Sequence, residues 1–368
     1  MRLKTIIAAA AAVTMMWSCG QKDPVPMFVG TYTDKGSSGI YSFMFDQETG
    51  KFDLEDSARI GNPSYLVLAP DDSFLYCVSE YTGDDATVNA FMINPKNGQM
   101  RIMNKVLAHG DDPCSITTHG RKAFTANYSS GSLSVFDIEK DGTLFDSGEV
   151  ITYENPSNAD TVRQAASHLH TVMRSPDGHY MFVTDLGGDC IYKFELRPDF
   201  KKGTPERTDL PKGCGPRHID FSVDSKYMYV ITELSDEIIV FDYEPVRGLL
   251  TQKQVVKASD AGARGGADIH VSPDGKFLYA SVRLKNDGIA IFKIKPDGTL
   301  EKVGYQNTGK HPRNFAITPN GKYLLVACRD DNRIEVYERN AETGLLTSTA
   351  RAMQVSQPAC IQFANPLI

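Results

Sequence analysis

A repeated pattern of two strands joined by a tight turn constrains this chain more than any other feature. Residues 267–280 read ADIHVSPDGKFLYA, and residues 313–326 read RNFAITPNGKYLLV. Related copies occur at 170–183, at 64–77, from Arg217 and, in shortened form, from Ser115. Proline presets the turn, and the glycine or asparagine accepts the positive φ that follows. Each copy therefore predicts a β-hairpin.

Two further strands follow each hairpin, such as 288–294 and the more polar 300–306. Four antiparallel strands in a repeat of about 46–55 residues match the size of a propeller blade. The alternation of apolar and polar residues excludes a stack of helical pairs. Seven innermost strands are predicted, beginning near Pro63, Pro113, Leu169, Pro216, Gly266, Pro312 and Pro358.

The two ends of the chain are predicted to complete one blade together. Residues 27–33, 39–45 and 51–60 read as second, third and fourth strands with no first strand before them, whereas the strand at Pro358 has no successors. Sharing a blade closes the ring without an exposed edge. The sequence thus predicts an all-β fold, one seven-bladed β-propeller over residues 27–368 with four antiparallel strands per blade.

The N-terminus is predicted to be an export signal. Two basic residues precede an apolar run, Ile6 to Trp17, that is too short to span a bilayer as a helix. Ser18 followed by Cys19 resembles a bacterial lipobox, in which the cysteine is acylated. We therefore expect residues 1–19 to be a lipoprotein signal and 20–26 a tether. The exported protein would contact a bacterial membrane only through its lipid anchor, in the periplasm or at the cell surface.

Composition limits the other partners. The net charge is -7, and no run of Lys or Arg occurs beyond the first residues, so nucleic acid is not expected to bind. No metal-ligand spacing, glycine-rich phosphate loop or Ser-His-Asp elbow occurs, so neither a metal nor a cofactor is expected. The six cysteines after Cys19 lie in strand patterns without a Cys-x-x-Cys spacing, which predicts mostly free thiols. A monomer is expected.

Polar residues recur where each inner strand opens and where the second strand of each blade ends. Both positions lie at the same face of the ring, because the two strands are antiparallel. The opening positions hold Ser64, Ser115, His170, Arg217, Ala267, Arg313 and Ala359. The closing positions hold Glu80, Tyr128, Leu186, Glu233, Arg283, Arg329 and, from the shared blade, Tyr32. Such an arginine-rich mouth would bind an anionic ligand.

At these residues the chain resembles the seven-bladed lactonases, a family that includes a bacterial 6-phosphogluconolactonase and a fungal carboxymuconate lactonizing enzyme. The resemblance runs from Met27 to about Asn365 and is carried by GPRH at 215–218, TEL at 232–234, GADIHVSPDG at 266–275, Arg283 and HPR at 311–313. It implies an active site made of His170, Arg217, Glu233 and Arg283. One insertion, 153–167, departs from the repeat and could reshape the rim of this site.

Hydrolysis of a lactone needs a base for water and positive charge at the oxyanion. We expect Glu233 to be the base. Arg217 and Arg283 would hold the anionic group of the substrate and stabilise the tetrahedral intermediate. His170 would act as an acid or orient the substrate.

Other residues of the mouth are expected to contact the substrate: Arg313, Arg329, Glu80, Tyr32, Asn127, Tyr128 and Asp185. Channel packing is the alternative for the tyrosines, Asn127 and Asp185, and a structural bridge to Glu80 is the alternative for Arg329. His218 is expected to point away from the channel by strand alternation. His168 and His270 are expected to be hydrogen-bonded structural residues.

Hydrolysis of a small anionic or sugar lactone is the predicted function, and 6-phosphogluconolactone is the best-known substrate of the family. Export would suit an extracytoplasmic sugar or uronic lactone better. Two alternatives stay open. The same base and arginines could serve a cycloisomerase that makes or opens a muconolactone, or the propeller could bind a carbohydrate or protein at the cell surface without catalysis.

Overall fold

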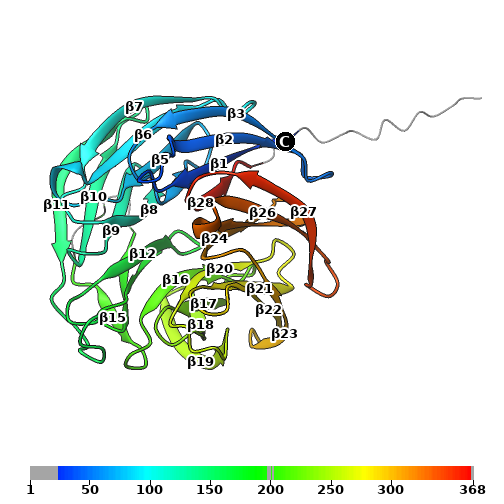
Figure 1. Cartoon of the computed structure of the whole chain (residues 1–368). Helices are drawn as coiled ribbons and strands as arrows, with labels where there is room; N and C mark the ends of the chain where they lie inside the picture. The colour runs from blue at the N-terminus through cyan, green and yellow to red at the C-terminus, as the bar shows by residue number, and fades with distance from the viewer. Residues whose placement is uncertain (1–23, 197–199, 201–202, 366–368) are drawn as a thin grey trace, which may run out of the picture.

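The computed structural model describes residues 24–196, 200 and 203–365, which form a ring of seven four-stranded antiparallel sheets (Figure 1). The chain follows the ring blade by blade, and its blue first strands meet its red last strands. The predicted seven-bladed β-propeller is confirmed. The expected signal and lipobox, residues 1–19, lie outside the described residues.

The shared blade has the order β28 (Pro358–Phe363), β1 (Val25–Thr31), β2 (Gly39–Phe45) and β3 (Phe52–Arg59). The next three blades are β4 (Leu66–Leu68), β5 (Phe74–Ser79), β6 (Thr87–Ile93) and β7 (Met100–Leu107); β8 (Pro113–His119), β9 (Lys122–Asn127), β10 (Ser132–Ile138) and β11 (Leu144–Thr152); and β12 (Leu169–Arg174), β13 (Tyr180–Asp185), β14 (Cys190–Glu195) and β15 (Glu206–Asp209).

The last three blades are β16 (Pro216–Phe221), β17 (Tyr227–Thr232), β18 (Glu237–Glu244) and β19 (Leu249–Lys257); β20 (Gly266–Val271), β21 (Phe277–Val282), β22 (Gly288–Ile294) and β23 (Leu300–Asn307); and β24 (Pro312–Ile317), β25 (Tyr323–Cys328), β26 (Arg333–Arg339) and β27 (Leu346–Gln354). Two short 3-10 helices also lie in the described chain, η1 (Gly83–Asp85) and η2 (Arg329–Asp331).

Most inner strands begin where the repeat predicts, but the start of the inner strand β4 differs, and so does the start of β1, the second strand of the shared blade. β1 starts at Val25, before the expected start of the propeller at Met27, so the end of the expected tether is part of a strand. β4 starts at Leu66 rather than near Pro63.

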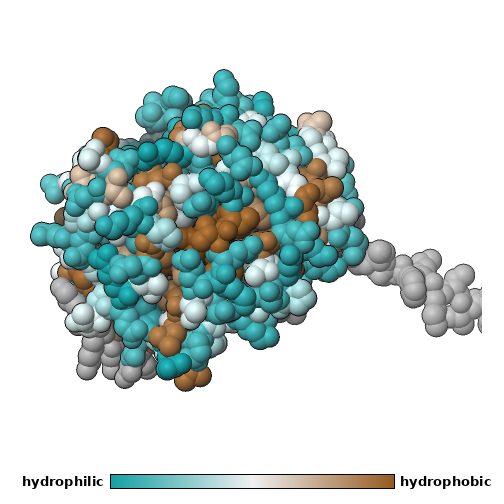
Figure 2. All heavy atoms as spheres, turned by 90° about the horizontal axis from the view of Figure 1, so that it is seen from below, coloured by the Kyte–Doolittle hydropathy of each residue, from teal (hydrophilic) through white to brown (hydrophobic). Residues whose placement is uncertain are grey.

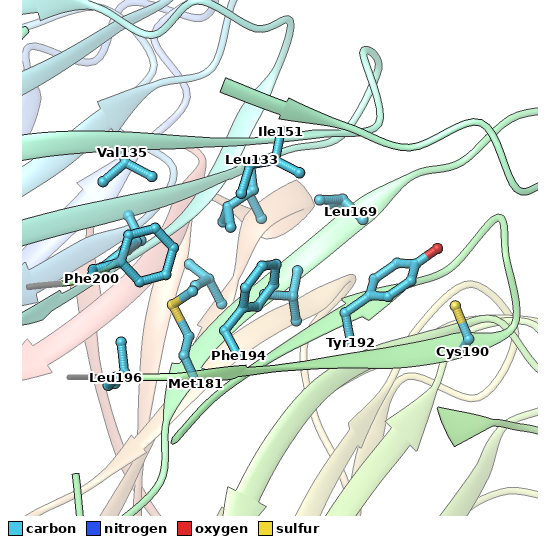
Figure 3. Packing of buried hydrophobic residues seen from close by; sticks show 14 residues of the cluster. Leu133, Val135, Ile151, Leu169, Met181, Cys190, Tyr192, Phe194, Leu196 and Phe200 are labelled. Atoms are coloured by element: carbon cyan, nitrogen blue, oxygen red, sulfur yellow. The ribbon is translucent and has the colours of Figure 1, made fainter. Parts of the chain in front are cut away.

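Apolar side chains pack between neighbouring blades and hold the ring together. Figure 3 shows one such cluster, in which Leu133 and Val135 of β10 face Met181 of β13 and Phe194 of β14. All four are 3% exposed or less. Burial of each such side chain stabilises the fold by roughly 1.5–3 kcal/mol, so this packing holds together blades whose sheets share no paired strands.

The N- and C-terminal strands close the ring by direct pairing. β28 pairs antiparallel with β1, from Met27 opposite Phe363 to Thr31 opposite Pro358. The amide of Ala364 adds a hydrogen bond to the carbonyl of Pro26 at 2.9 Å. The predicted shared blade is therefore present.

Every inner strand except β4 carries an irregularity near its first residue. In β16, Pro216 pairs with Thr232 and His218 pairs with Ile231, so Arg217 is the extra residue of a β-bulge. The same shift occurs in β8, β12, β20, β24 and β28. A bulge re-aims the extra side chain, and the bulges sit at the face where the closing positions lie.

The opposite face is formed by the hairpin turns. There Ser222 donates to Asp224 at 2.7 Å and Ser272 donates to Asp274 at 2.6 Å, so the turn side chains bind their own turns. In Figure 2 most of the visible surface is hydrophilic, with hydrophobic residues in a central stretch. None of the helices in the described chain is long and apolar enough to cross a membrane.

The six described cysteines are buried and form no disulfides, as predicted: Cys77, Cys114, Cys190, Cys214, Cys328 and Cys360.

Candidate active site

Glu233, the residue directly after β17, is the centre of a cluster of arginines. Its Oε2 accepts from Arg217 Nε and from Arg283 Nη2, both at 3.0 Å. Its Oε1 accepts from Arg163 Nη2 at 2.5 Å. Arg217 comes from the bulge of β16, whereas Arg283 follows β21, so two blades and a loop supply the three guanidiniums.

The charge of this cluster controls the ionisation of Glu233. Burial alone would raise the pKa of the carboxyl group, but Arg283, Arg217 and Arg163 outweigh it and lower the pKa to about 2. Glu233 is therefore ionised at neutral pH. Three positive charges around one carboxylate leave a net positive site in a protein whose overall charge is -7.

Arg217 and Arg283 are held in place by backbone carbonyls. Arg217 donates through Nη1 to the carbonyl of Ala267 at 2.5 Å. Arg283 donates through Nε to the carbonyl of Gly265 at 3.2 Å. Burial and then Arg217 lower the pKa of Arg283 to about 9, so its guanidinium keeps its charge at neutral pH. Both side chains are thus fixed cations.

His170, from the bulge of β12, lies beside the cluster as a neutral imidazole. Its ring is 5.8 Å from the ring of Tyr128 and 5.1 Å from that of His218. Burial and then the charge of Arg217 hold the pKa of His170 well below its usual range. Its Nδ1 is buried and has no partner in the described chain. A buried polar atom without a partner is uncommon and marks a position where a ligand or water would bind.

Arg313 and Glu80 form a second ion pair at the mouth. Arg313 Nη2 is 3.6 Å from Glu80 Oε2, and the Arg313 guanidinium lies 5.1 Å from the ring centre of Tyr32. The Tyr32 hydroxyl donates to both carboxylate oxygens of Glu80 at 2.9 Å. Arg313 contributes to the depressed pKa of His170, so the two ion-pair clusters belong to one electrostatic site.

Arg329 pairs with its neighbour in the chain rather than with Glu80. Arg329 lies in η2 and its Nε donates to Asp330 at 2.7 Å, while Arg313 takes the place beside Glu80. The alternative for Arg329, a structural bridge to Glu80, is therefore wrong, because the chain turns into a 3-10 helix at Arg329.

Asn127 and Asp185 bind the chain rather than standing free at the mouth. The Asn127 amide donates to the hydroxyls of Ser132 and Ser134. Asp185 Oδ1 accepts from the amides of His168 and Gly188 at 2.8 and 2.9 Å. Both residues are fully buried, which corresponds to the packing alternative for each.

Tyr128 and its neighbour His168 form a stacked pair with ring centres 4.5 Å apart. His168 Nδ1 lies 2.9 Å from the Tyr128 carbonyl, as expected for a hydrogen-bonded structural histidine. The Tyr128 hydroxyl accepts from Arg163 Nη2 at 3.1 Å. Tyr128 therefore connects His170 to the arginine cluster.

The expectation that His218 points away from the channel is wrong. Its ring is 7% exposed, lies against His170 and binds Asp268 through Nδ1 at 2.6 Å. The bulge at Arg217 shifts the alternation by one residue, so consecutive residues both turn inward.

Arg163 is the main residue of the site that the repeat did not indicate. It lies in the insertion 153–167, which has no counterpart in the other blades. The only signal in the sequence is that this insertion ends directly before His168 and His170, at the predicted mouth. No group of three or more His, Cys, Asp or Glu side chains suited to a metal was found among the described residues.

The comparisons with known proteins agree with this fold. The family model described as "Lactonase, 7-bladed beta-propeller" matches residues 26–363. The chain therefore belongs to this family of seven-bladed propeller lactonases. It is an enzyme of the lactonase class, a hydrolase.

Individual relatives are similar over nearly their whole length. The 6-phosphogluconolactonase of Bacillus subtilis is 33% identical over 92% of this chain and 98% of the relative. The crystal structure of a putative 6-phosphogluconolactonase from Bacteroides fragilis is 46% identical, with a TM-score of 0.91, and the match covers 95% of this chain and 99% of that one. The periplasmic gluconolactonase of Pseudomonas aeruginosa is 31% identical, with a TM-score of 0.87, over 93% and 99%.

Proposed function

We propose that this lactonase hydrolyses a sugar-derived lactone of the 6-phosphogluconolactone type at the Glu233 cluster. The observation that carries the proposal is the convergence of one ionised carboxylate, three guanidiniums and a neutral imidazole at one face of the ring. Relatives named 6-phosphogluconolactonase and gluconolactonase support the same chemistry.

The fixed cations suit the electrostatic part of the reaction. When water adds to the carbonyl carbon, negative charge develops on the carbonyl oxygen. Arg217 and Arg283 would stabilise this charge without reorganising, because backbone carbonyls already orient them. Charge stabilisation of this kind is worth roughly 3–4 kcal/mol per donor.

Proton transfer would complete the reaction. Glu233 takes a proton from the attacking water as the new C–O bond forms. The ring C–O bond then breaks, and the leaving alkoxide receives that proton, which gives the open hydroxy acid. Because His170 is neutral, it would donate or accept a hydrogen bond to the substrate rather than act as a cationic acid.

Glu233→Gln tests the proposal. We expect a loss of at least about 100-fold in kcat/KM for glucono-δ-lactone and its 6-phosphate, because positioned general bases contribute 10²–10⁴-fold. Glu233→Asp keeps the negative charge that the arginines need, so this variant should fold. Its shorter side chain moves the carboxylate away from the substrate, so kcat/KM should still fall at least about 10-fold.

The matched control is Glu139→Gln, which removes a carboxylate that is paired with Arg121 and 51% exposed. Rates of both Glu233 variants within about threefold of wild type would contradict the role of Glu233. Turnover of a muconolactone but of neither sugar lactone would favour the cycloisomerase, and no turnover would favour a binding propeller.

We also propose that the enzyme is exported and lipid-anchored through Cys19. The lipobox-like sequence supports this, as does the periplasmic location that the name of the Pseudomonas aeruginosa relative states. Cys19→Ser should move the protein from the membrane fraction to the soluble fraction and abolish incorporation of labelled palmitate. A membrane fraction that is unchanged by Cys19→Ser would refute the anchor.

A further inference from the structure

Arg163 differs from the other two arginines of the Glu233 cluster in its exposure. Its side chain is 38% exposed, whereas those of Arg217 and Arg283 are 2% and 7% exposed. Of these three guanidiniums, only that of Arg163 is substantially open to solvent. A ligand that enters the site meets this charge before it meets the other two.

The loop backbone on both sides of Arg163 is anchored. The Asp160 carboxylate accepts from the amides of Val162 and Arg163 at 2.9 Å and also binds the Arg264 guanidinium. On the other side, Gln164 is fully buried and donates to the carbonyl of Leu186 at 2.8 Å. The backbone therefore presents the Arg163 side chain from a fixed place.

The guanidinium of Arg163 retains unused donors. Its bonds to Glu233 and to the Tyr128 hydroxyl both leave from Nη2. Arginine has five N–H donors in a planar fork. Within the described chain its Nη1 and Nε donate no hydrogen bond, so these atoms can bind an anion in the two-point manner that arginine prefers.

We propose that Arg163 is a specificity-determining residue, which binds the anionic group of the lactone and loosens its bridge to Glu233 as it does so. The inference rests on the proposed lactone hydrolysis and adds a link between substrate charge and the base. A phosphate carries about -1.5 to -2 charges, more than the Glu233 carboxylate, and would compete for the guanidinium.

This exchange would make the site more reactive only for charged substrates. With Arg163 on the substrate, two guanidiniums remain on Glu233 in place of three. The pKa of Glu233 then rises from its low value, and the carboxylate becomes a stronger base when an anionic lactone is bound. A neutral lactone has no group that draws Arg163 away.

Arg163→Gln, assayed with glucono-δ-lactone and with its 6-phosphate, tests the inference. We expect kcat/KM for the phosphorylated lactone to fall by about 10–100-fold and that for the neutral lactone to rise, because only two guanidiniums then lower the pKa of Glu233. Arg163→Lys keeps the charge without the fork, so it should recover part of the loss. Inorganic phosphate should inhibit opening of the neutral lactone at least about tenfold more weakly in Arg163→Gln than in wild type.

Arg121→Gln is the matched control, because it removes an exposed arginine that pairs with Glu139 outside the site. It should change neither substrate's kcat/KM. Equal effects of Arg163→Gln on both lactones, or no effect on either, would overturn the inference while the proposed hydrolysis stands. A wild-type enzyme that opens only the neutral lactone would also overturn the inference. A wild-type enzyme that opens neither lactone would refute the proposed function, and the inference with it.

Discussion

Asp268 is a buried carboxylate that connects three inner strands. It accepts from His218 Nδ1 of β16 at 2.6 Å, from His270 Nε2 of β20 at 3.0 Å and from Asn314 Nδ2 of β24 at 2.5 Å. Inner strands of different blades share no sheet, so such side-chain bonds fix their relative positions. Asp268 therefore holds His218 against His170 at the site.

The two histidines on Asp268 differ in charge. Burial and the charge of Arg217 lower the pKa of His218 to about 4. Burial opposes the charge of His270 too, but Asp268 outweighs it and raises the pKa of His270 to about 9. At neutral pH His270 is therefore a cation paired with the Asp268 carboxylate, while His218 is neutral and donates a hydrogen bond to Asp268.

His270→Gln is expected to lower stability in a pH-dependent way. Because the pKa of His270 is raised above its unfolded value of about 6.5, its contribution is complete below pH 6.5 and is lost as the pH rises through about 9. The side chain is 34% exposed, so solvent screening limits the effect to about 1–2 kcal/mol.

Urea unfolding of wild type and His270→Gln at pH 6 and pH 9.5 measures this contribution. The difference in unfolding free energy between the two proteins should shrink at the higher pH. His179→Gln is the control, because His179 is 69% exposed and lies 3.9 Å from its acidic neighbour. A difference that is the same at both pH values would show that His270 is not charged in the folded protein.

At the scale of elements, the insertion 153–167 depends on a close approach to Gly187. A methyl group on Gly187 would lie 1.8 Å from the carbonyl oxygen of Ala166, and the amide of Ser157 donates to the Gly187 carbonyl at 2.9 Å. Only glycine allows the loop to lie this close to the end of β13.

Gly187→Ala should therefore displace the loop without dismantling the blade. We expect amide hydrogens of the insertion to exchange at least about tenfold faster, because their hydrogen bonds open more often. Hydrogen exchange read by mass spectrometry measures this. In Gly120→Ala the added methyl would meet no atom within 4 Å, and the strain of the positive φ is confined to the turn between β8 and β9, so exchange of the insertion should not change in that variant. Unaltered exchange in Gly187→Ala would mean that the loop is held elsewhere.

The repeat predicted the elements well because its turn residues mark each blade. The inner strands at Pro113, Leu169, Pro216, Gly266 and Pro312 begin at those residues. The alternation of side-chain direction along a strand was a less reliable guide to which residues face the channel. The predicted direction of the His218 side chain was wrong because the bulge at Arg217 adds one residue to the strand. A bulge depends on how two strands pair, and the sequence of one strand does not show that pairing.

The site could be predicted only where the repeat continues. Arg217 opens the inner strand of one blade, and Glu233 and Arg283 close the second strands of that blade and the next, so superposing the copies placed them together. Arg163 has no equivalent, because its loop occurs once. The alternative bridge from Arg329 to Glu80 failed for a local reason, since the turn into η2 redirects the Arg329 side chain.

At the scale of the whole molecule, the pairing of β28 with β1 is expected to control stability. Ending the chain at Gln357 would remove β28 and with it the buried Ala359, Cys360 and Ile361. The lost burial and hydrogen bonds amount to several kcal/mol, against a total stability of about 5–15 kcal/mol for a typical domain.

We therefore expect the chain that ends at Gln357 to lose its cooperative thermal transition, measured by circular dichroism. Excess peptide with the sequence of residues 358–365 should restore the transition, which separates an open ring from a misfolded one. A truncated chain that melts within about 5 °C of the full chain would show that the ring holds without the shared blade.

The position of β1 as the second strand of its blade also affects the order of events during synthesis. The first strand that leaves the ribosome must wait for the last before its inner edge is paired. At about 5–20 residues per second, translation of the intervening chain takes roughly 15–65 s. Throughout that time the nascent protein presents an unpaired strand edge, so it depends on protection from aggregation until its final residues are made.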